Sequence, residues 1–205
     1  MTTSNAGPND LIAYWLGKAE HSPAAVKAQS KLWYGSSSKT DAEIRTRFGP
    51  CLALAEQGGL QQWAATASGK LALVILLDQF TRNLNRGAKE AWHNDEQALS
   101  IAKLCIANDE HTTLPVFGRV FLYHPFHHAE SLEAQDKAVD LFAKLYDESP
   151  ETWRDTLQGF VDFSKHHRQT IQRFGRFPHR NKTLGRTSTS DEVHYLEQNS
   201  RKYGQ

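Results

Sequence analysis

The sequence predicts an all-α fold built from antiparallel pairs of helices. No segment alternates apolar and polar residues in the way that a half-buried strand requires. Apolar residues instead recur at spacings of three and four, which places them on one face of a helix. The segments with this pattern are moderately long and their connections are short, which favours antiparallel neighbours. We find no internal repeat at a fixed period.

Composition limits the size and the class of the protein. The 205 residues suit one domain, and 39% apolar residues are enough for a sizeable core. The net charge is +1, so the overall field does not draw the chain onto nucleic acid or a membrane. Cys51 and Cys105 lack the spacing of a zinc site, and we expect both to be reduced, buried residues of a cytoplasmic protein. The first ten residues lack a signal-peptide pattern, and the longest apolar run, 71–77, is too short to span a bilayer.

The chain is expected to form one domain with two polar ends. Residues 1–8 should be disordered, residues 9–198 should form a single all-helical domain, and residues 199–205 should be a polar tail. Glycine, proline and serine residues predict loops at 17–23 and 35–38.

Three helices are expected in the first third of the chain. Asn9 or Asp10 would cap the first of them. Thr40 would cap the second, which Pro50 should kink or split and which the glycine pair at 58–59 ends. The predicted helices cover residues 11–16, 40–57 and 60–67.

The most apolar helix is expected over residues 68–84, and charged residues lie near its C-terminal end. Asp78 and Arg82 are four residues apart and can pair across one turn. Because the acid follows seven apolar residues, we expect the pair to be buried. A buried ion pair is costly to desolvate and is rarely retained for stability alone. The pair is therefore either part of a functional site or a simple ion pair on one helix. The predicted face comprises Leu71, Val74, Ile75, Asp78 and Arg82.

The middle of the chain is expected to hold three further helices. Asn94 or Asp95 would cap the first, and residues 115–123 would form a second, short one. Pro125 fits the first turn of the third, which would run to about Tyr146. The inward side chains should be Ala98, Ile101, Leu104 and Cys105 in the first, and His128, Leu132, Gln135, Val139, Phe142 and Tyr146 in the third.

The last long helix is expected to start at residues 149–151 and has the most regular apolar seam. A short helix over 191–196 should follow, capped by Ser188 or Ser190. The seam of the long helix comprises Trp153, Leu157, Phe160, Ser164, His167, Ile171 and Phe174.

Two histidines occupy positions where core residues are expected, His128 at the head of one stripe and His167 in the middle of the other. Each is either a core histidine bonded to a carbonyl or carboxylate, or a general acid or base. Glu130 lies about 200° around a regular helix from His128, so the helix start is irregular or the two serve different neighbours. No HExxH or paired ExxH pattern occurs, and we predict neither a metal nor another cofactor.

Residues 173–186 form the most unusual stretch. Two glycines and a proline interrupt regular structure, and between them lie arginines, whose donor forks suit carboxylate or phosphate. In one interpretation the segment is a clasp, in which Phe174 and Phe177 enter the core and the arginines pair with acids. In the other it binds an anion; nucleic acid is disfavoured by the near-neutral charge. With Arg82 and Asn83 of the earlier helix, the candidate ligand-binding residues are Arg173, Arg176, His179, Arg180, Asn181 and Arg186.

Four motifs resemble those of a known family. They are LLDQFTRN at 76–83, PFHHAE at 125–130, HRQTIQRFGRFPHRN at 167–181 and LGRTST at 184–189. Over nearly its whole length the chain resembles the bacterial family catalogued as domain of unknown function 924. The resemblance implies an all-helical fold similar to a tetratricopeptide-like right-handed array, and no established reaction. The chain departs from the expected Glu-His-Ser-Glu pattern at His127 and Ala129, which leaves His128 and Glu130 in place.

These patterns together predict a polar site whose reaction stays open. Its catalytic candidates are Asp78, His128, Glu130 and His167, with a carboxylate orienting a histidine that moves a proton. The expected ligand is a small anionic molecule or a peptide carboxylate, with a preference for hydrolytic or transfer chemistry. One alternative is a helical-repeat adaptor that binds a peptide or protein tail. The other is a structural polar core in which each arginine and acid is paired internally. The sequence leaves the oligomeric state open.

Overall fold

The computed structural model describes residues 6–199, and within them the chain forms helices and no strands, which confirms the all-α prediction. None of the described helices is long and apolar enough to cross a membrane. The helices are α1 Pro8–Leu16, α2 Pro23–Tyr34, α3 Ser38–Glu56, α4 Ala67–Val74, α5 Thr81–Leu84, α6 Asp95–Ala107, α7 Val116–His128, α8 Leu132–Glu148, α9 Arg154–Phe174 and α10 Ser190–Gln198.

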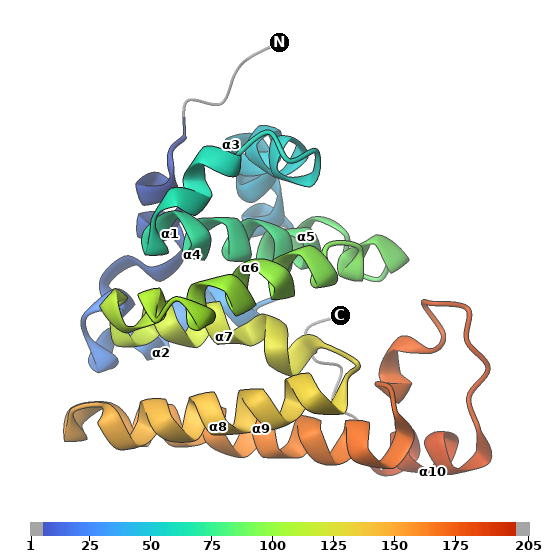
Figure 1. The fold of residues 1–205 in the computed structure, drawn as a ribbon. Coiled ribbons are helices and arrows are strands. Elements are labelled where there is room, and N and C mark those ends of the chain that lie inside the picture. Colours follow the sequence, from blue (N-terminus) through green and yellow to red (C-terminus); the bar gives the residue numbers. More distant parts are fainter. Residues whose placement is uncertain (1–5, 200–205) are drawn as a thin grey trace.

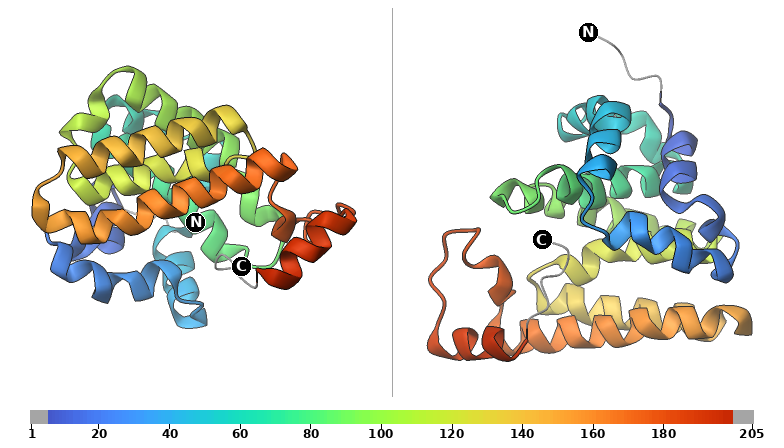
Figure 2. Two further views of the ribbon diagram at one scale, coloured as in Figure 1. Left: turned by 90° about the horizontal axis from the view of Figure 1, so that it is seen from below. Right: turned by 180° about the vertical axis from the view of Figure 1, so that it is seen from behind.

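The helices are stacked in layers (Figure 1). Helices α8 and α9 pack against each other as a long pair, and α7 packs on α8. Helix α4 contacts both α1 and α6, so it lies between these two helices in the part of the fold above α7 in Figure 1. Seen from below and from behind, α10 lies beyond the C-terminal end of α9, joined to it by the segment 175–189 (Figure 2). This arrangement is compatible with a tetratricopeptide-like array, whose handedness stays a prediction.

Aromatic side chains hold the layers together. The ring of Trp15 on α1 is fully buried and lies edge-on to Phe80 at 5.2 Å and to Phe121 at 5.7 Å between centroids. Trp33 on α2 stacks on Phe117 of α7 at 4.9 Å. Edge-on and stacked pairs of this kind add to the free energy gained by burying the rings. The core therefore fixes α7 and the helical segment after α4 that carries Phe80, and both lead to the polar residues described below.

The predicted helix over 68–84 is one continuous helix with a widened turn. Helix α4 runs directly into a π-helical segment, Ile75–Phe80, and then into α5. All six residues of the π-helical segment are buried, including Asp78. Single π-helical turns are rare in proteins and are frequent at functional sites.

The prediction that Pro125 opens a helix is wrong, because α7 continues through Pro125 and ends at His128. The last carbonyls of α7 have partners outside the helix, which is how a helix end is satisfied. Gln135 of α8 donates its amide Nε2 to the carbonyls of His127, at 2.9 Å, and Ala129, at 2.8 Å. Helix α8 begins afresh after Ser131, whose hydroxyl accepts the amide of Ala134. His128 therefore lies at the C-terminal end of one helix and not in the first turn of the next.

Three predicted helix starts are displaced by short side-chain contacts. Helix α1 begins at Pro8, within the segment expected to be disordered, and the carboxylate of Asp10 accepts the amide of Gly7. Ser37, not Thr40, caps α3, and Thr189 caps α10 in a capping box with Glu192. The expected first and last segments otherwise fall mainly on residues 1–5 and 200–205, which lie outside the described residues.

Two other predictions about elements are corrected. Pro50 does not split α3, which runs unbroken to Glu56. Leu104 and Leu132, predicted to face inward, are 52% and 41% exposed. Ala102 and Ala134 occupy the buried positions instead. The seam of α9 is confirmed at Leu157, Ser164, His167 and Ile171.

Candidate functional site

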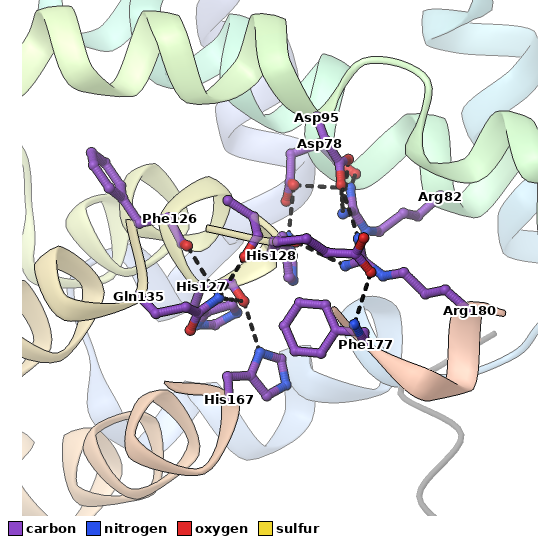
Figure 3. Close-up of polar contacts among 12 residues, drawn as sticks. Asp78, Arg82, Asp95, Phe126, His127, His128, Gln135, His167, Phe177 and Arg180 are labelled. Atoms are coloured by element: carbon purple, nitrogen blue, oxygen red, sulfur yellow. Dashed lines mark hydrogen bonds and ion pairs between the residues drawn. The ribbon is translucent and has the colours of Figure 1, made fainter. Parts of the chain in front are cut away.

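The polar centre begins with an acid that the π-helical segment holds inside the protein. The side chain of Asp78 is fully buried. Arg82, one turn later, donates Nη1 to the Oδ1 atom of Asp78 at 2.9 Å and to its main-chain carbonyl at 2.6 Å. The predicted pairing and the predicted burial are both confirmed. His128 reaches the same carboxylate from the end of α7, with its Nδ1 atom 2.7 Å from Oδ1 (Figure 3). We call Asp78 and His128 the dyad.

Burial and the neighbouring arginine set the charges of the dyad. Burial alone would raise the pKa of Asp78, but Arg82 and the contact with His128 outweigh it and hold that pKa well below its usual range. Burial lowers the pKa of His128 to about 3, against the opposing attraction of Asp78. At neutral pH the carboxylate is therefore ionised and the imidazole is neutral. Because the carboxylate can only accept, the ring proton of His128 lies on Nδ1 and the lone pair on Nε2.

That lone pair is available. Within residues 6–199 no group forms a hydrogen bond to Nε2 of His128, and the His128 side chain is 15% exposed. An imidazole oriented through Nδ1 by a buried carboxylate, with Nε2 open, has the arrangement of a general base.

A second arginine and a second acid complete the centre. Arg82 donates Nη2 to the Oδ2 atom of Asp95, at the start of α6, at 3.0 Å. Arg180, in the segment between α9 and α10, donates Nη2 to the carbonyl of His128 at 2.9 Å and places Nη1 3.5 Å from Asp95. The Arg180 guanidinium also lies over the rings of Phe177, at 4.6 Å, and Trp92, at 5.4 Å. Its Nε is buried and has no partner among the described residues.

The burial of Arg180 and Asp95 shifts both pKa values. Burial lowers the pKa of Arg180 to about 10, which still leaves the guanidinium charged at neutral pH. Burial also raises the pKa of Asp95, against Arg82 and Arg180, which lower it. From the sequence, Asp95 is expected only as a helix cap, and Trp92 is not among the candidate site residues. An acid in the first turn of a helix ordinarily complements the helix dipole, so no local pattern signals this contact.

Glu130 belongs to a separate brace. Its carboxylate accepts both amino groups of Arg186, at 2.6 and 2.9 Å, and the main-chain amide of Phe177 at 2.8 Å. Glu130 and His128 thus serve different neighbours, one of the two outcomes expected from their spacing. Arg186 also donates Nε to Asn181, whose amide donates to Ser188. Glu130, Asn181 and Arg186 fix the shape of the segment that presents Arg180.

Arg173 and Arg176 face α10 and not the dyad. Arg173 pairs with Asp191, and Arg176 binds both carboxylate oxygens of Glu192 at 2.7 and 2.9 Å. A hollow of about 400 Å³ lies between them, lined by both pairs together with Phe174 and Thr189. Both guanidiniums that line it are already paired with carboxylates.

His167, a predicted catalytic candidate, does not contact the dyad directly. Its Nδ1 lies 2.8 Å from the carbonyl of His127, which fits the interpretation of a core histidine bonded to a carbonyl. The ring of His127 lies between them, 5.0 Å from His167 and 4.6 Å from His128 by centroids. His127 is 1% exposed, and neither ring nitrogen has a partner within residues 6–199. Burial lowers the pKa of His127, and that of His167 to about 3.

The last two candidates are Asn83 and His179. Asn83 donates its amide to Asp41 of α3 at 3.0 Å. His179 follows Pro178 in the same turn as Arg180 and lies 5.6 Å from the Phe177 ring. Burial, Arg180 and Arg186 lower the pKa of His179 to about 3, and His128 is among the groups that act on it. Within the described chain, no group of three or more His, Cys, Asp or Glu residues is placed to hold a metal ion.

Comparison with known proteins gives a family and a solved fold. The family model described as bacterial protein of unknown function (DUF924) matches residues 11–200. The structure of a protein of unknown function, ATU0120 from Agrobacterium tumefaciens, is similar at a TM-score of 0.78 and 32% identity. The similarity covers 93% of this chain and 97% of that one. Among curated proteins, none matches the chain significantly.

Proposed function

We propose that this chain, which belongs to the bacterial DUF924 family of unknown function, binds a small anionic molecule and uses His128 as a general base on it. The observation that supports this most directly is the dyad. Asp78 is fully buried and bonds to Nδ1 of His128 at 2.7 Å, while Nε2 stays open. The dyad thus combines an open ring nitrogen with a buried carboxylate that orients the ring, which is the arrangement of a general base.

Each neighbour of the dyad would have a defined part. Asp78 would hold the tautomer and orientation of His128 and stabilise the imidazolium that forms when Nε2 takes a proton. Arg82 would keep Asp78 ionised. Arg180 would hold the anionic group of the ligand, because it is charged and its Nε lacks a partner. The brace of Glu130 and Arg186 would position Arg180 and would not touch the ligand.

Nε2 would remove a proton from water or from a hydroxyl group of the ligand. That step belongs to hydrolytic or group-transfer chemistry, which we favour for this site. The low pKa of His128 keeps the base form fully populated at neutral pH, although it makes the imidazole a weaker acceptor. Because the imidazole is a weak base, it would remove a proton that is already made more acidic by the ligand itself or by the positive charge of Arg180.

A structural polar core is the second candidate, and the pairing of the arginines favours it. Every arginine selected from the sequence has a carboxylate partner: Asp78 and Asp95 for Arg82, Asp191 for Arg173, Glu192 for Arg176, Asp95 for Arg180 and Glu130 for Arg186. This candidate predicts that substitutions at the dyad lower stability and change no binding.

A binding screen with three variants separates the two candidates. His128→Asn keeps a donor near the position of Nδ1 and removes the base at Nε2, and Arg180→Gln removes the proposed anion contact. Arg173→Gln is the matched control, because it breaks an exposed ion pair with Asp191 away from the dyad. The ligands are anionic metabolites and short peptides, and the readout is the rise in Tm that a ligand of the native state causes.

The expected result is an anion that raises the Tm of the native protein and of Arg173→Gln but not of Arg180→Gln. His128→Asn should bind the same anion and fail to turn it over. If no anion acts, or if Arg180→Gln responds like the native protein, the structural core replaces the proposed site. Peptides that bind where small anions do not would support the adaptor instead.

A further inference from the structure

We infer that the site takes a carboxylate monoanion in preference to a phosphate ester, an inference that rests on the proposed function. It follows from the number of charged groups near the dyad and from the hydrogen-bond donors of the arginines that are not held by a carboxylate.

The polar centre is balanced in charge as long as Asp95, whose pKa burial raises, is ionised. Three carboxylates, those of Asp78, Asp95 and Glu130, face three guanidiniums, which belong to Arg82, Arg180 and Arg186. The histidines around them add no charge at neutral pH, because burial lowers their pKa values: His124, His127, His128, His167 and His179. A ligand that enters the centre therefore adds its whole charge to a region without a surplus cation.

Two of the three guanidiniums are held at short distance by the carboxylates. Arg186 uses both amino groups on Glu130 and its Nε on Asn181. Arg82 bridges the two other acids, with Nη1 on Asp78 and Nη2 on Asp95. A ligand that drew either arginine away would leave a buried carboxylate without its partner, which is costly.

Arg180 has donors to spare. Its one short contact is to a neutral carbonyl, that of His128, and its contact with Asp95 is long at 3.5 Å. Its Nε has no partner among the described residues, although its side chain is only 7% exposed. One planar guanidinium with free donors matches one planar carboxylate, which it can bind through two parallel hydrogen bonds.

A phosphate dianion would meet opposition here. Its second charge would have no cation of its own and would lie near Asp95 and Asp78, in a poorly solvated place where like charges repel strongly. The site also lies at the C-terminal end of α7, whose dipole disfavours anions. Protein sites for phosphate commonly use the opposite end of a helix, where main-chain amides point at the ligand.

The experiment compares three small probes that differ in charge and shape: acetate, methyl phosphate and dimethyl phosphate. It is run near pH 8, where methyl phosphate is a dianion because its second pKa is about 6. Binding is followed by the ring-nitrogen NMR signals of His128. Dimethyl phosphate is tetrahedral but carries a single charge, so it separates charge from shape.

Acetate should saturate the His128 signals at concentrations at least about tenfold lower than methyl phosphate. Dimethyl phosphate should bind better than methyl phosphate. Asp95→Asn removes one opposing charge and should reduce the difference in affinity between acetate and methyl phosphate. Arg173→Gln, the matched control, should leave this difference in affinity unchanged.

Two results would overturn the inference, and they differ in what they do to the proposed function. Methyl phosphate binding as tightly as acetate, with loss of binding in Arg180→Gln, would remove the preference for a monoanion and leave the anion site in place. The absence of any response to all three probes, or a response that Arg180→Gln retains, would remove both.

Discussion

His128 should stay neutral at pH values where a free imidazole is protonated, because burial lowers its pKa to about 3. Diethyl pyrocarbonate acylates the unprotonated ring, and Nε2 of His128 is open to it. Between pH 7.5 and pH 5, the neutral fraction of N-acetylhistidine, with a pKa of about 6.5, falls about thirtyfold. The acylation of His128, measured by peptide mass spectrometry against N-acetylhistidine in the same tube, should fall far less. A parallel loss of the two signals would show that the pKa of His128 is ordinary.

Asp78→Asn should be among the most destabilising polar substitutions in the chain. It removes the buried charge that Arg82 and His128 both contact, and breaking a buried ion pair in this way typically costs about 3–5 kcal/mol. Asp191→Asn is the control, because its ion pair with Arg173 is about half exposed and should contribute less than about 1 kcal/mol. Urea denaturation of both variants measures the difference. Equal losses would show that Asp78 contributes no more to stability than a surface acid.

The sequence predicted those parts of the site that depend on local spacing. The Asp78–Arg82 pair follows from four residues on one helix, and its burial follows from seven apolar residues before it. The contacts of Asp95 with Arg180, across 85 positions of chain, depend on how α6 meets the segment after α9. No periodicity encodes such a meeting. Arg176 is a similar case. It was predicted to contact a ligand, but in the fold it pairs with Glu192 of α10.

Two glycines in helices should respond in opposite ways to alanine. At Gly69 in α4 a Cβ atom would lie 1.8 Å from the carbonyl oxygen of Trp63, so the backbone must shift. Gly69→Ala should therefore cost about 1–3 kcal/mol, as overpacking usually does. At Gly159 in α9 a Cβ would meet nothing within 4 Å, and alanine should stabilise the helix by about 1 kcal/mol. Thermal unfolding measures both, and a loss of stability in Gly159→Ala would contradict the contacts described for α9.

Helix boundaries show where local signals compete. Pro125 is a strong start signal, yet α7 passes through it and ends at His128, where Gln135 and Arg180 from elsewhere in the fold satisfy the carbonyls of His127 and His128. Ser131 then supplies the cap of α8. A prediction from sequence considers each local signal separately. In the folded protein, the end of a helix also depends on the side chains that reach its terminal carbonyls from other elements. This difference decides the place of His128, and with it the dyad.

At the scale of the whole molecule, the buried histidines should make the fold sensitive to acid. Burial lowers the folded-state pKa values of His124, His127, His128 and His167 below the unfolded value of about 6.5. Below that value the unfolded chain binds more protons than the folded one, so stability is fully present above pH 6.5. It is lost as the pH falls from there towards the folded values, by about 1.4 kcal/mol per pH unit for each linked proton. Urea denaturation between pH 7.5 and 4.5 measures the slope.

His127 allows this sensitivity to be assigned to one ring. It is stacked on Phe142 at 5.6 Å and has no hydrogen-bond partner for either ring nitrogen within the described residues. His127→Phe and His127→Leu both remove one linked proton and leave no broken hydrogen bond. Both should reduce the slope below pH 6.5 by about 1.4 kcal/mol per pH unit. Their stabilities at pH 7.5 should differ, because only phenylalanine matches the ring that it replaces. A slope unchanged in both variants would mean that His127 is protonated in the folded protein or that it has an unseen partner, and the acid sensitivity would then belong to the other histidines.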